Sequence, residues 1–271
     1  MLFGYAGSGS WWFAFQHLSI RRYGHPVDNL DFAAVTHAGS VKQVNEDSVL
    51  ARPPVFAVAD GISGCQRGEI ASSLVLRTLA RLADESELTP DAVAAALADA
   101  HAGVLESQAR DHHRAATTVC GAVALEIGEV AYWVVFNAGD SRLYRQLAPG
   151  EALEQLSVDH SHVQELVTAG VITEEEAEVH PERHVITRAV GSKAGFQPDY
   201  WLVPMVPGER LLICTDGLLR DVEFDRIEAI VAGETSAEET VQQLLDIALA
   251  AGARDNVSVV VVDVNDAPVR V

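Results

Sequence analysis

Cysteine is scarce in this chain of 271 residues, and its placement carries no metal-binding or disulfide pattern. The three cysteines, Cys65, Cys120 and Cys214, are scattered and odd in number. A disulfide framework and a cysteine-rich zinc site are therefore excluded as organising features. We interpret the three residues as reduced core cysteines, which predicts a cytoplasmic protein.

Positive charge is also in short supply. The chain has 19 Lys and Arg against 39 Asp and Glu, a formal net charge of −20. This balance argues against nucleic acid or an anionic membrane surface as the main partner. The same negative charge raises the local concentration of cations, which suits a divalent metal site.

No Pro/Gly/Ser-rich linker divides the chain, and 48% hydrophobic residues are enough for a sizeable core. We predict one catalytic domain over residues 31–266, followed by a short tail at 267–271. The first thirty residues form an extension of uncertain structure.

That extension begins with an uncharged stretch from Leu2 to Ile20, which includes Trp11 to Phe15. Its glycines and serines make it a poor membrane span, and no basic region precedes it as in a signal peptide. Three interpretations stay open: a poorly structured or surface-packed extension, an interfacial anchor or partner contact through residues 1–22, and a mis-assigned start.

Apolar spacing predicts the order of secondary structure along the rest of the chain. Strands are expected at Phe32–Val35, Asp47–Leu50, Val55–Ala59, Thr117–Ile127, Val130–Asn137, Ser141–Arg145, Asp199–Val203, Glu209–Cys214 and Val257–Val264. Helices are expected at Glu69–Leu82, Asp91–Gln108, Val222–Val231 and Ala237–Ala250, with partial helix in Glu154–Glu178. Thr89-Pro90 supplies an N-cap and a helix-starting proline, and Thr173, followed by three glutamates, is a favourable helix start. This order does not alternate as a doubly wound sheet would, and it indicates two packed, mostly antiparallel sheets with helix pairs outside.

Carboxylates stand at the ends of three strongly apolar strands. They belong to Asp60-Gly61, Asp216-Gly217 and Asp255-Asn256, and Asn45-Glu46-Asp47 opens a further strand. A single Asp-Gly after a strand is usually only a turn, but the joint occurrence makes that interpretation weaker. If the strands share one sheet system the acids meet, and oxygen ligands without His or Cys favour Mg²⁺ or Mn²⁺ over zinc.

Eight stretches in order resemble the metal-dependent Ser/Thr protein phosphatases, the PPM or type 2C family, over about residues 31–264. They are Thr36 to Asp47, Ala59 to Gly64, Ala116 to Thr118, Gly139 to Arg142, Asp159 to Ser161, Thr187 to Gly191, Cys214 to Leu218, and Asp255 to Val257. The resemblance implies an α+β fold, a four-layer α-β-β-α sandwich with two mostly antiparallel sheets flanked by helix pairs.

The resemblance also implies a site for two Mn²⁺ or Mg²⁺ ions. Asp60 would bridge the two ions, the Gly61 carbonyl would join one, and Asp216 and Asp255 would hold the other. Glu46 and Asp47 would bind through water molecules or orient them.

This chain departs from the family pattern at several positions. Lys42 stands where the family often has an arginine; it is either a solubilising surface charge or, as its spacing favours, a phosphate-binding and catalytic residue. Ile62 replaces the histidine of eukaryotic members and resembles the bacterial branch, where the leaving group can take its proton from water. Ser63 replaces a common glycine.

Bacterial members often bind a third metal through the residue that corresponds to Asp140, and here His184 would be its partner. The alternative is that Asp140 caps its own backbone. The polar segment from about Ser157 to Arg188 is predicted to form a flap beside the cleft that contacts substrate. The remaining histidines, including His112 and His113, lack ligand spacing and are interpreted as solvated surface.

These observations predict a bacterial-type phosphatase that hydrolyses phosphoserine and phosphothreonine in proteins with a metal-activated water. Phosphorylated proteins and a cognate Ser/Thr kinase are the implied partners. Two alternatives stay open: a catalytically weak module that binds phosphoproteins, and a hydrolase of small phosphoesters.

Overall fold

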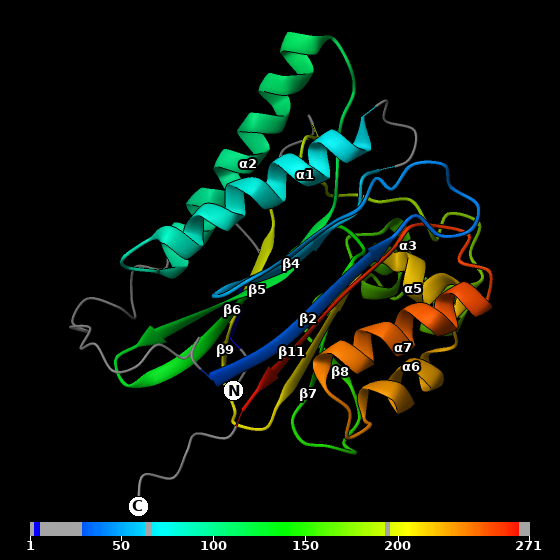
Figure 1. The fold of residues 1–271 in the computed structure, drawn as a ribbon. Coiled ribbons are helices and arrows are strands. Elements are labelled where there is room, and N and C mark those ends of the chain that lie inside the picture. Colours follow the sequence, from blue (N-terminus) through cyan, green and yellow to red (C-terminus); the bar gives the residue numbers. More distant parts are fainter. Residues whose placement is uncertain (1–2, 6–28, 63–66, 193–195, 266–271) are drawn as a thin grey trace, which may run out of the picture.

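Two antiparallel sheets lie face to face with helices on their outer faces (Figure 1). The computed structural model describes residues 3–5, 29–62, 67–192 and 196–265. Within these, the first sheet has the order β1 (Phe3–Tyr5), β9 (Asp199–Pro204), β6 (Val130–Ala138), β5 (Val119–Ile127), β4 (Val55–Ala59) and β3 (Ser48–Arg52). The second has the order β2 (Leu30–His37), β11 (Val257–Val264), β10 (Arg210–Cys214), β7 (Arg142–Gln146) and β8 (Glu154–Gln155).

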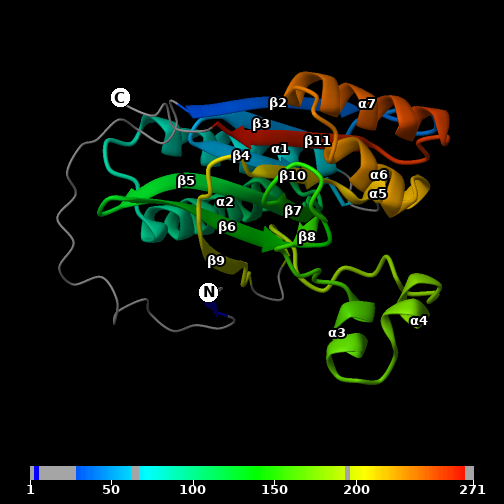
Figure 2. The same ribbon diagram turned by 90° about the horizontal axis from the view of Figure 1, so that it is seen from below.

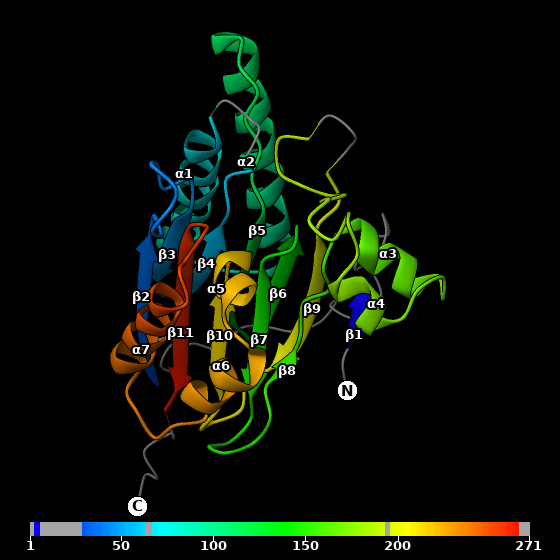
Figure 3. The same cartoon turned by 90° about the vertical axis from the view of Figure 1, so that its right-hand side faces the viewer.

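Helices cover the outer face of each sheet. Those on the first sheet are α1 (Gly68–Leu79), which continues as a 3-10 turn (Ala80–Asp84), and α2 (Pro90–Asp111). Those on the second are α5 (Asp216–Asp221), α6 (Phe224–Val231) and α7 (Ala237–Ala250), as Figure 3 shows from the side. The predicted α+β sandwich of four layers is therefore confirmed.

Among the described residues, three apolar cores hold the layers together. One lies between α1, α2 and the first sheet, another between α5, α6, α7 and the second sheet, and the third between the two sheets. All five residues of β4 are buried because its alternate side chains face a helix layer and the opposite sheet. This double burial explains why the strand sequence is a continuous apolar run.

Helix starts follow the local signals in the sequence. The Thr89 side chain accepts a hydrogen bond from Ala92 N, and Pro90 occupies the first helical position of α2. Thr173 forms a capping box with Glu176 at the start of α4 (Glu174–Glu178). Both predicted starts are confirmed, and in each case the cap satisfies a backbone N–H that the helix cannot.

One short helix differs from expectation, whereas the region that was predicted to be partly helical does contain helices. Helix α5 begins at Asp216, although the sequence indicated no helix between the strand that ends at Cys214 and the helix expected from Val222. Val222 itself is extended and lies between α5 and α6. The region Glu154–Glu178 contains β8, α3 (His162–Thr168) and α4. Figure 2 shows α3 and α4 apart from the sheets, which explains why only Val163 among their residues is buried.

Within the N-terminal extension, β1 adds an antiparallel edge strand to β9, with Phe3 opposite Leu202. The remainder of residues 1–28 lies outside the described residues, as do Ser63, Cys65 and the tail at 267–271. Among the helices that the structure describes, none is both long and apolar enough to cross a lipid bilayer.

Candidate active site

Acidic residues from both sheets meet along one edge of the sandwich. Asp60 follows β4 in the first sheet, whereas Asp216 follows β10 and Asp255 precedes β11 in the second. Burial raises the pKa of Asp60 well above its ordinary value, and the charges of Asp47, Asp216, Asp140 and Asp255 raise it further. The structure thus brings together the carboxylates that the sequence placed at strand ends.

Asp47 is buried at the centre of this group, with its two carboxylate oxygens in different surroundings. Oδ2 accepts hydrogen bonds from Thr215 Oγ1 at 2.9 Å and Ser258 Oγ at 2.7 Å. Oδ1 is equally buried and meets no donor among the described residues. Burial raises the pKa of Asp47 to about 7, despite the two hydrogen bonds.

Glycine allows the backbone segments of the site to approach closely. A Cβ on Gly61 would stand 2.6 Å from the Glu46 carbonyl oxygen, and one on Gly217 would stand 1.9 Å from the Asn256 carbonyl oxygen. Both distances are shorter than any side chain tolerates. The two Asp-Gly pairs therefore reflect close backbone packing rather than free turns.

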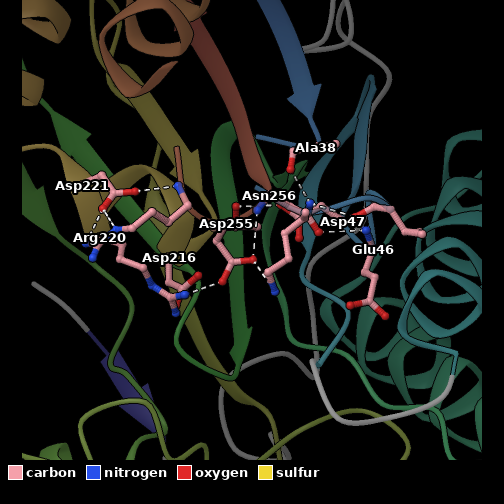
Figure 4. Close-up of polar contacts among 12 residues, drawn as sticks. Ala38, Glu46, Asp47, Asp216, Arg220, Asp221, Asp255 and Asn256 are labelled. Carbon is pink, nitrogen blue, oxygen red and sulfur yellow. Dashed lines mark hydrogen bonds and ion pairs between the residues drawn. The ribbon is translucent and has the colours of Figure 1, made fainter. Parts of the chain in front are cut away.

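Asn256 ties the loop before β3 to the start of β11. Its Nδ2 donates to the carbonyl oxygens of Ala38 and Val44 at 2.9 and 3.0 Å, and its Oδ1 accepts from Glu46 N at 2.9 Å. Figure 4 shows these contacts beside Asp255. The sequence motif was recognised, but this positioning role was missed because its partners lie more than two hundred residues away.

Two cationic side chains hold Asp255. Lys42 Nζ lies 2.9 Å from Asp255 Oδ1. Arg220, in α5, donates from Nη1 to Asp255 Oδ2 and from Nη2 to Asp216 Oδ2 at 2.6 Å (Figure 4). Lys42 was a predicted site residue, whereas Arg220 was missed although its spacing of four residues from Asp216 places both on one helix face.

Glu46 lies at the margin of the acidic group. Its carboxylate stands against Gly68 at the start of α1, since a Cβ on Gly68 would come 2.7 Å from Glu46 Oε1. Burial raises the pKa of Glu46, and the nearby Lys42 partly offsets that effect. The role of Glu46 in orienting water stays a prediction.

Asp140 belongs to the same electrostatic cluster. Burial raises the pKa of Asp140 to about 7, with Asp216 and Asp159 adding to the effect. Its neighbour Gly139 donates from its backbone N to His160 Nδ1 at 3.2 Å, so the loop after β6 rests on a buried histidine. His184 is largely exposed on the flap, and its partial removal from water, together with the charges of Arg220 and Arg183, lowers its pKa.

A partly buried polar network anchors the ends of the flap. His160 Nε2 and Arg188 Nη1 both lie 3.0 Å from the Asp199 carboxylate, and Arg142 forms a two-pronged ion pair with Asp159. These side chains join the strands of both sheets to the segment that carries α3 and α4. No local pattern in the sequence indicates the His160–Asp199 contact.

Among the histidines that the structure describes, the interpretation as solvated surface was wrong for His113 and His160. His160 is 4% exposed because Asp199 and Gly139 engage both ring nitrogens. The His113 side chain is 9% exposed and lies 3.8 Å from Asp111. For His160 a partner fixed by the fold compensates for removal from water, and ligand spacing along the chain cannot reveal such a partner. The ring nitrogens of His113 are buried and have no hydrogen-bond partner among the described residues.

The donor set fits divalent cations. Carboxylate oxygens with raised pKa values stand together, and Asp47 Oδ1 is a buried acceptor without a donor, which is costly unless a cation compensates it. No three His, Cys, Asp or Glu side chains of the described residues already converge as a complete metal-ligand group. Asp216 and Asp255 are held by Arg220 and Lys42 instead.

Comparison with known proteins identifies the architecture. The sequence model of the family described as Protein phosphatase 2C matches residues 36–257. The serine/threonine protein phosphatase PstP of Mycobacterium tuberculosis is 36% identical over 241 residues, which cover 88% of this chain and 45% of that protein. The chain thus spans about half the length of that relative. The protein phosphatase PhpP of Streptococcus pneumoniae is 30% identical over 249 residues, which cover 88% of this chain and 98% of that protein.

Solved structures agree in fold. The M. tuberculosis PstP/Ppp structure has a TM-score of 0.79 and 34% identity, covering 88% of this chain and 99% of that one. A catalytic-domain structure of PstP in complex with two manganese ions has a TM-score of 0.77 and 34% identity, with the same coverage. Since both the family model and these relatives extend over most of its length, the chain belongs to the protein phosphatase 2C family.

Proposed function

We propose that this protein is a metal-dependent phosphatase that hydrolyses phosphoserine and phosphothreonine in proteins and opposes a Ser/Thr kinase. The observation that carries the proposal is the cluster of partly buried carboxylates at an edge to which both sheets contribute, with the buried Asp47 Oδ1 meeting no donor among the described residues. The names of the relatives, which are Ser/Thr protein phosphatases, support the same reaction.

Asp60, Asp216, Asp255 and the Gly61 carbonyl would hold two Mn²⁺ or Mg²⁺ ions, with Glu46 and Asp47 acting on them through water. When bound, such ions supply acidification of water and neutralisation of the phosphoryl oxygens, the two requirements of phosphate monoester hydrolysis. Asp60 suits the bridging position because the charges of four other carboxylates act on it. Asp140 and His184 are the candidates for a third ion.

Lys42 is proposed to attract the substrate phosphate. Its ammonium group lies at the cleft, 2.9 Å from Asp255 Oδ1, and its side chain is 31% exposed. A mobile ammonium can therefore reach a phosphoryl oxygen beside the metal-binding carboxylates. Ile62, whose backbone is fixed by a hydrogen bond to Ala116, offers no side-chain acid. The leaving hydroxyl would therefore take its proton from water.

The exposed side chains of the flap favour proteins over small phosphoesters as the substrates. Val171 and Val179 are 65% and 78% exposed on this segment, and α4 buries none of its residues. Apolar side chains beside a cleft can contact the residues that flank a phosphorylated side chain. Cys120 and Cys214 are both buried and unbridged, which supports a cytoplasmic location.

The test is hydrolysis of a phosphothreonine peptide and of p-nitrophenyl phosphate, with Mn²⁺ and then with chelator. Turnover of both substrates that chelator abolishes is the expected result. Hydrolysis of nucleotides without phosphopeptides would favour the small-phosphoester alternative. Phosphopeptide binding without turnover in either condition would favour the regulatory module.

A further inference from the structure

Arg220 occupies a place in the acidic cluster that the two-metal assignment leaves unexplained. Its guanidinium bridges one oxygen of Asp216 and one of Asp255, which come from different segments of the second sheet. These are the two carboxylates proposed to hold one divalent ion together. A guanidinium and a metal ion cannot both take the same oxygen lone pairs at contact distance.

The rest of the structure does not require this bridge in order to place the two carboxylates. Gly217 packs directly on the Asn256 carbonyl, and Asp221 accepts hydrogen bonds from Arg254 N at 2.8 Å and Arg254 Nε at 2.6 Å. Both contacts fix α5 against the segment that carries Asp255. The position of the acids is therefore set by backbone packing, and the main effect of Arg220 is to compensate their negative charge.

The guanidinium is also loosely held on its other side. Its Nε is buried, and no hydrogen-bond acceptor among the described residues reaches it. The side chain is 26% exposed, so a path to solvent is open. Departure of the Arg220 head group would break its two carboxylate contacts and allow the unpaired N–H to reach water.

We propose that Arg220 is an internal counter-cation that competes with the divalent ion for Asp216 and Asp255. In the metal-free protein it neutralises the pair, and on metal binding it leaves these oxygens. The arginine thus sets the metal concentration at which the site fills. This inference rests on the proposed metal-dependent function and adds a means of regulating that site.

The test measures Mn²⁺ binding by titration calorimetry on the full chain stripped of metal. Arg220→Gln removes the competing charge and should bind Mn²⁺ about tenfold more tightly, the change that corresponds to the loss of one charge-assisted contact of about 1.4 kcal/mol. The matched control is Arg226→Gln on the neighbouring α6, which removes the same charge from an exposed position. Its Mn²⁺ affinity should stay within about twofold of wild type, because solvent screens its charge.

Thermal unfolding supplies a second readout. In chelator, Arg220→Gln should unfold at a lower temperature than wild type, because the two carboxylates lose their counter-charge. In saturating Mn²⁺ that deficit should disappear. If Arg220→Gln does not fold without metal, Arg220→Lys keeps the charge but cannot bridge both carboxylates, and it should also bind Mn²⁺ more tightly than wild type.

Unchanged or weaker Mn²⁺ binding by the Arg220 variants would overturn the proposal. An equal gain in Mn²⁺ affinity in Arg220→Gln and Arg226→Gln would also overturn it, since the change in the net charge of the protein would then explain the effect. If the wild-type protein binds no Mn²⁺ at all, the proposed metal-dependent function fails together with this inference.

Discussion

At the scale of single residues, the surroundings of Asp60 strongly disfavour its ionised carboxylate. Burial and four neighbouring carboxylates all oppose its ionised form. Such a residue destabilises the protein unless a cation joins it, which is typical of sites built for function rather than stability.

We therefore expect Asp60→Asn to have opposite effects on activity and stability. Activity should fall on the order of a hundredfold or more, because metal ions contribute several kcal/mol of transition-state stabilisation. In chelator, the variant should unfold at a higher temperature than wild type, since one charge leaves the cluster. Phosphopeptide turnover and calorimetry check the two effects, with the exposed Asp99→Asn as control. Near-wild-type turnover in saturating Mn²⁺ would contradict the assignment.

Lys42 provides the second prediction at this scale. Lys42→Ala should raise KM for phosphopeptides several-fold or more, a loss of roughly 1 to 3 kcal/mol for a charge-assisted hydrogen bond. Lys42→Arg should retain or improve activity, because a guanidinium can grip two phosphate oxygens. Steady-state kinetics at low ionic strength measures both. An unchanged kcat/KM in Lys42→Ala would assign the phosphate contact to another residue.

Local sequence was sufficient to find some site residues and insufficient for others. The sequence was sufficient to find Asp60, Asp216 and Asp255, because each stands beside an apolar strand. The residues adjacent in sequence therefore indicate that each carboxylate lies at a strand end. Arg220 could not be found in this way, because its contact with Asp255 spans 35 residues and depends on a short helix that the sequence did not indicate. His160 was wrongly interpreted as exposed for the same reason, since its partner Asp199 is 39 residues away.

At the scale of elements, the flap is separable from the layered body. Its helices α3 and α4 bury only Val163 between them, whereas the ends of the segment are fixed by Arg142–Asp159 and His160–Asp199. The anchor points thus belong to the body, and the helices between them contribute little to its core.

Replacing Gln164 to Glu178 by a short Gly-Ser linker should therefore leave the fold intact and change substrate choice. We expect turnover of phosphoproteins to change more than turnover of p-nitrophenyl phosphate, because only the larger substrate extends to the flap. The small substrate serves as the internal control. Equal losses on both substrates would argue against a selective role.

The element order was largely predictable, because apolar periodicity distinguishes strands from helices even where their ends shift by a few residues. The helix starts at Thr89 and Thr173 were local signals and were confirmed. Helix α5 was not predictable. It is only six residues long, and packing of Gly217 on Asn256 rather than helix propensity accounts for its position.

At the scale of the whole molecule, a buried charge network joins the sheets at the end opposite the acidic site. Glu209, 1% exposed, accepts from Trp133 Nε1 at 2.8 Å and pairs with Arg145. Arg145 in turn donates to the Pro204 carbonyl oxygen at 3.0 Å. Trp133 and Pro204 belong to the first sheet, and Arg145 belongs to the second.

Glu209→Ala should consequently lower the free energy of unfolding by about 3 to 5 kcal/mol, because it leaves Arg145 buried without its partner. Mn²⁺ affinity of the folded variant should not change. Denaturant unfolding measures the effect, with Asp84→Ala in the exposed Arg52–Asp84 pair as control, expected to lose less than about 1 kcal/mol. A loss no larger than that of the control would contradict the role of this network.

The division of the proposed metal-binding carboxylates between two sheets has a consequence for the protein's lifetime. If Asp60 binds from one sheet and Asp216 and Asp255 from the other, the ion that these three residues share links the two sheets. Its binding free energy is then added to that of folding and grows with the logarithm of free metal concentration. In a manganese-poor cell the enzyme would lose conformational stability as well as turnover, and proteases that act on opened chains would lower its abundance.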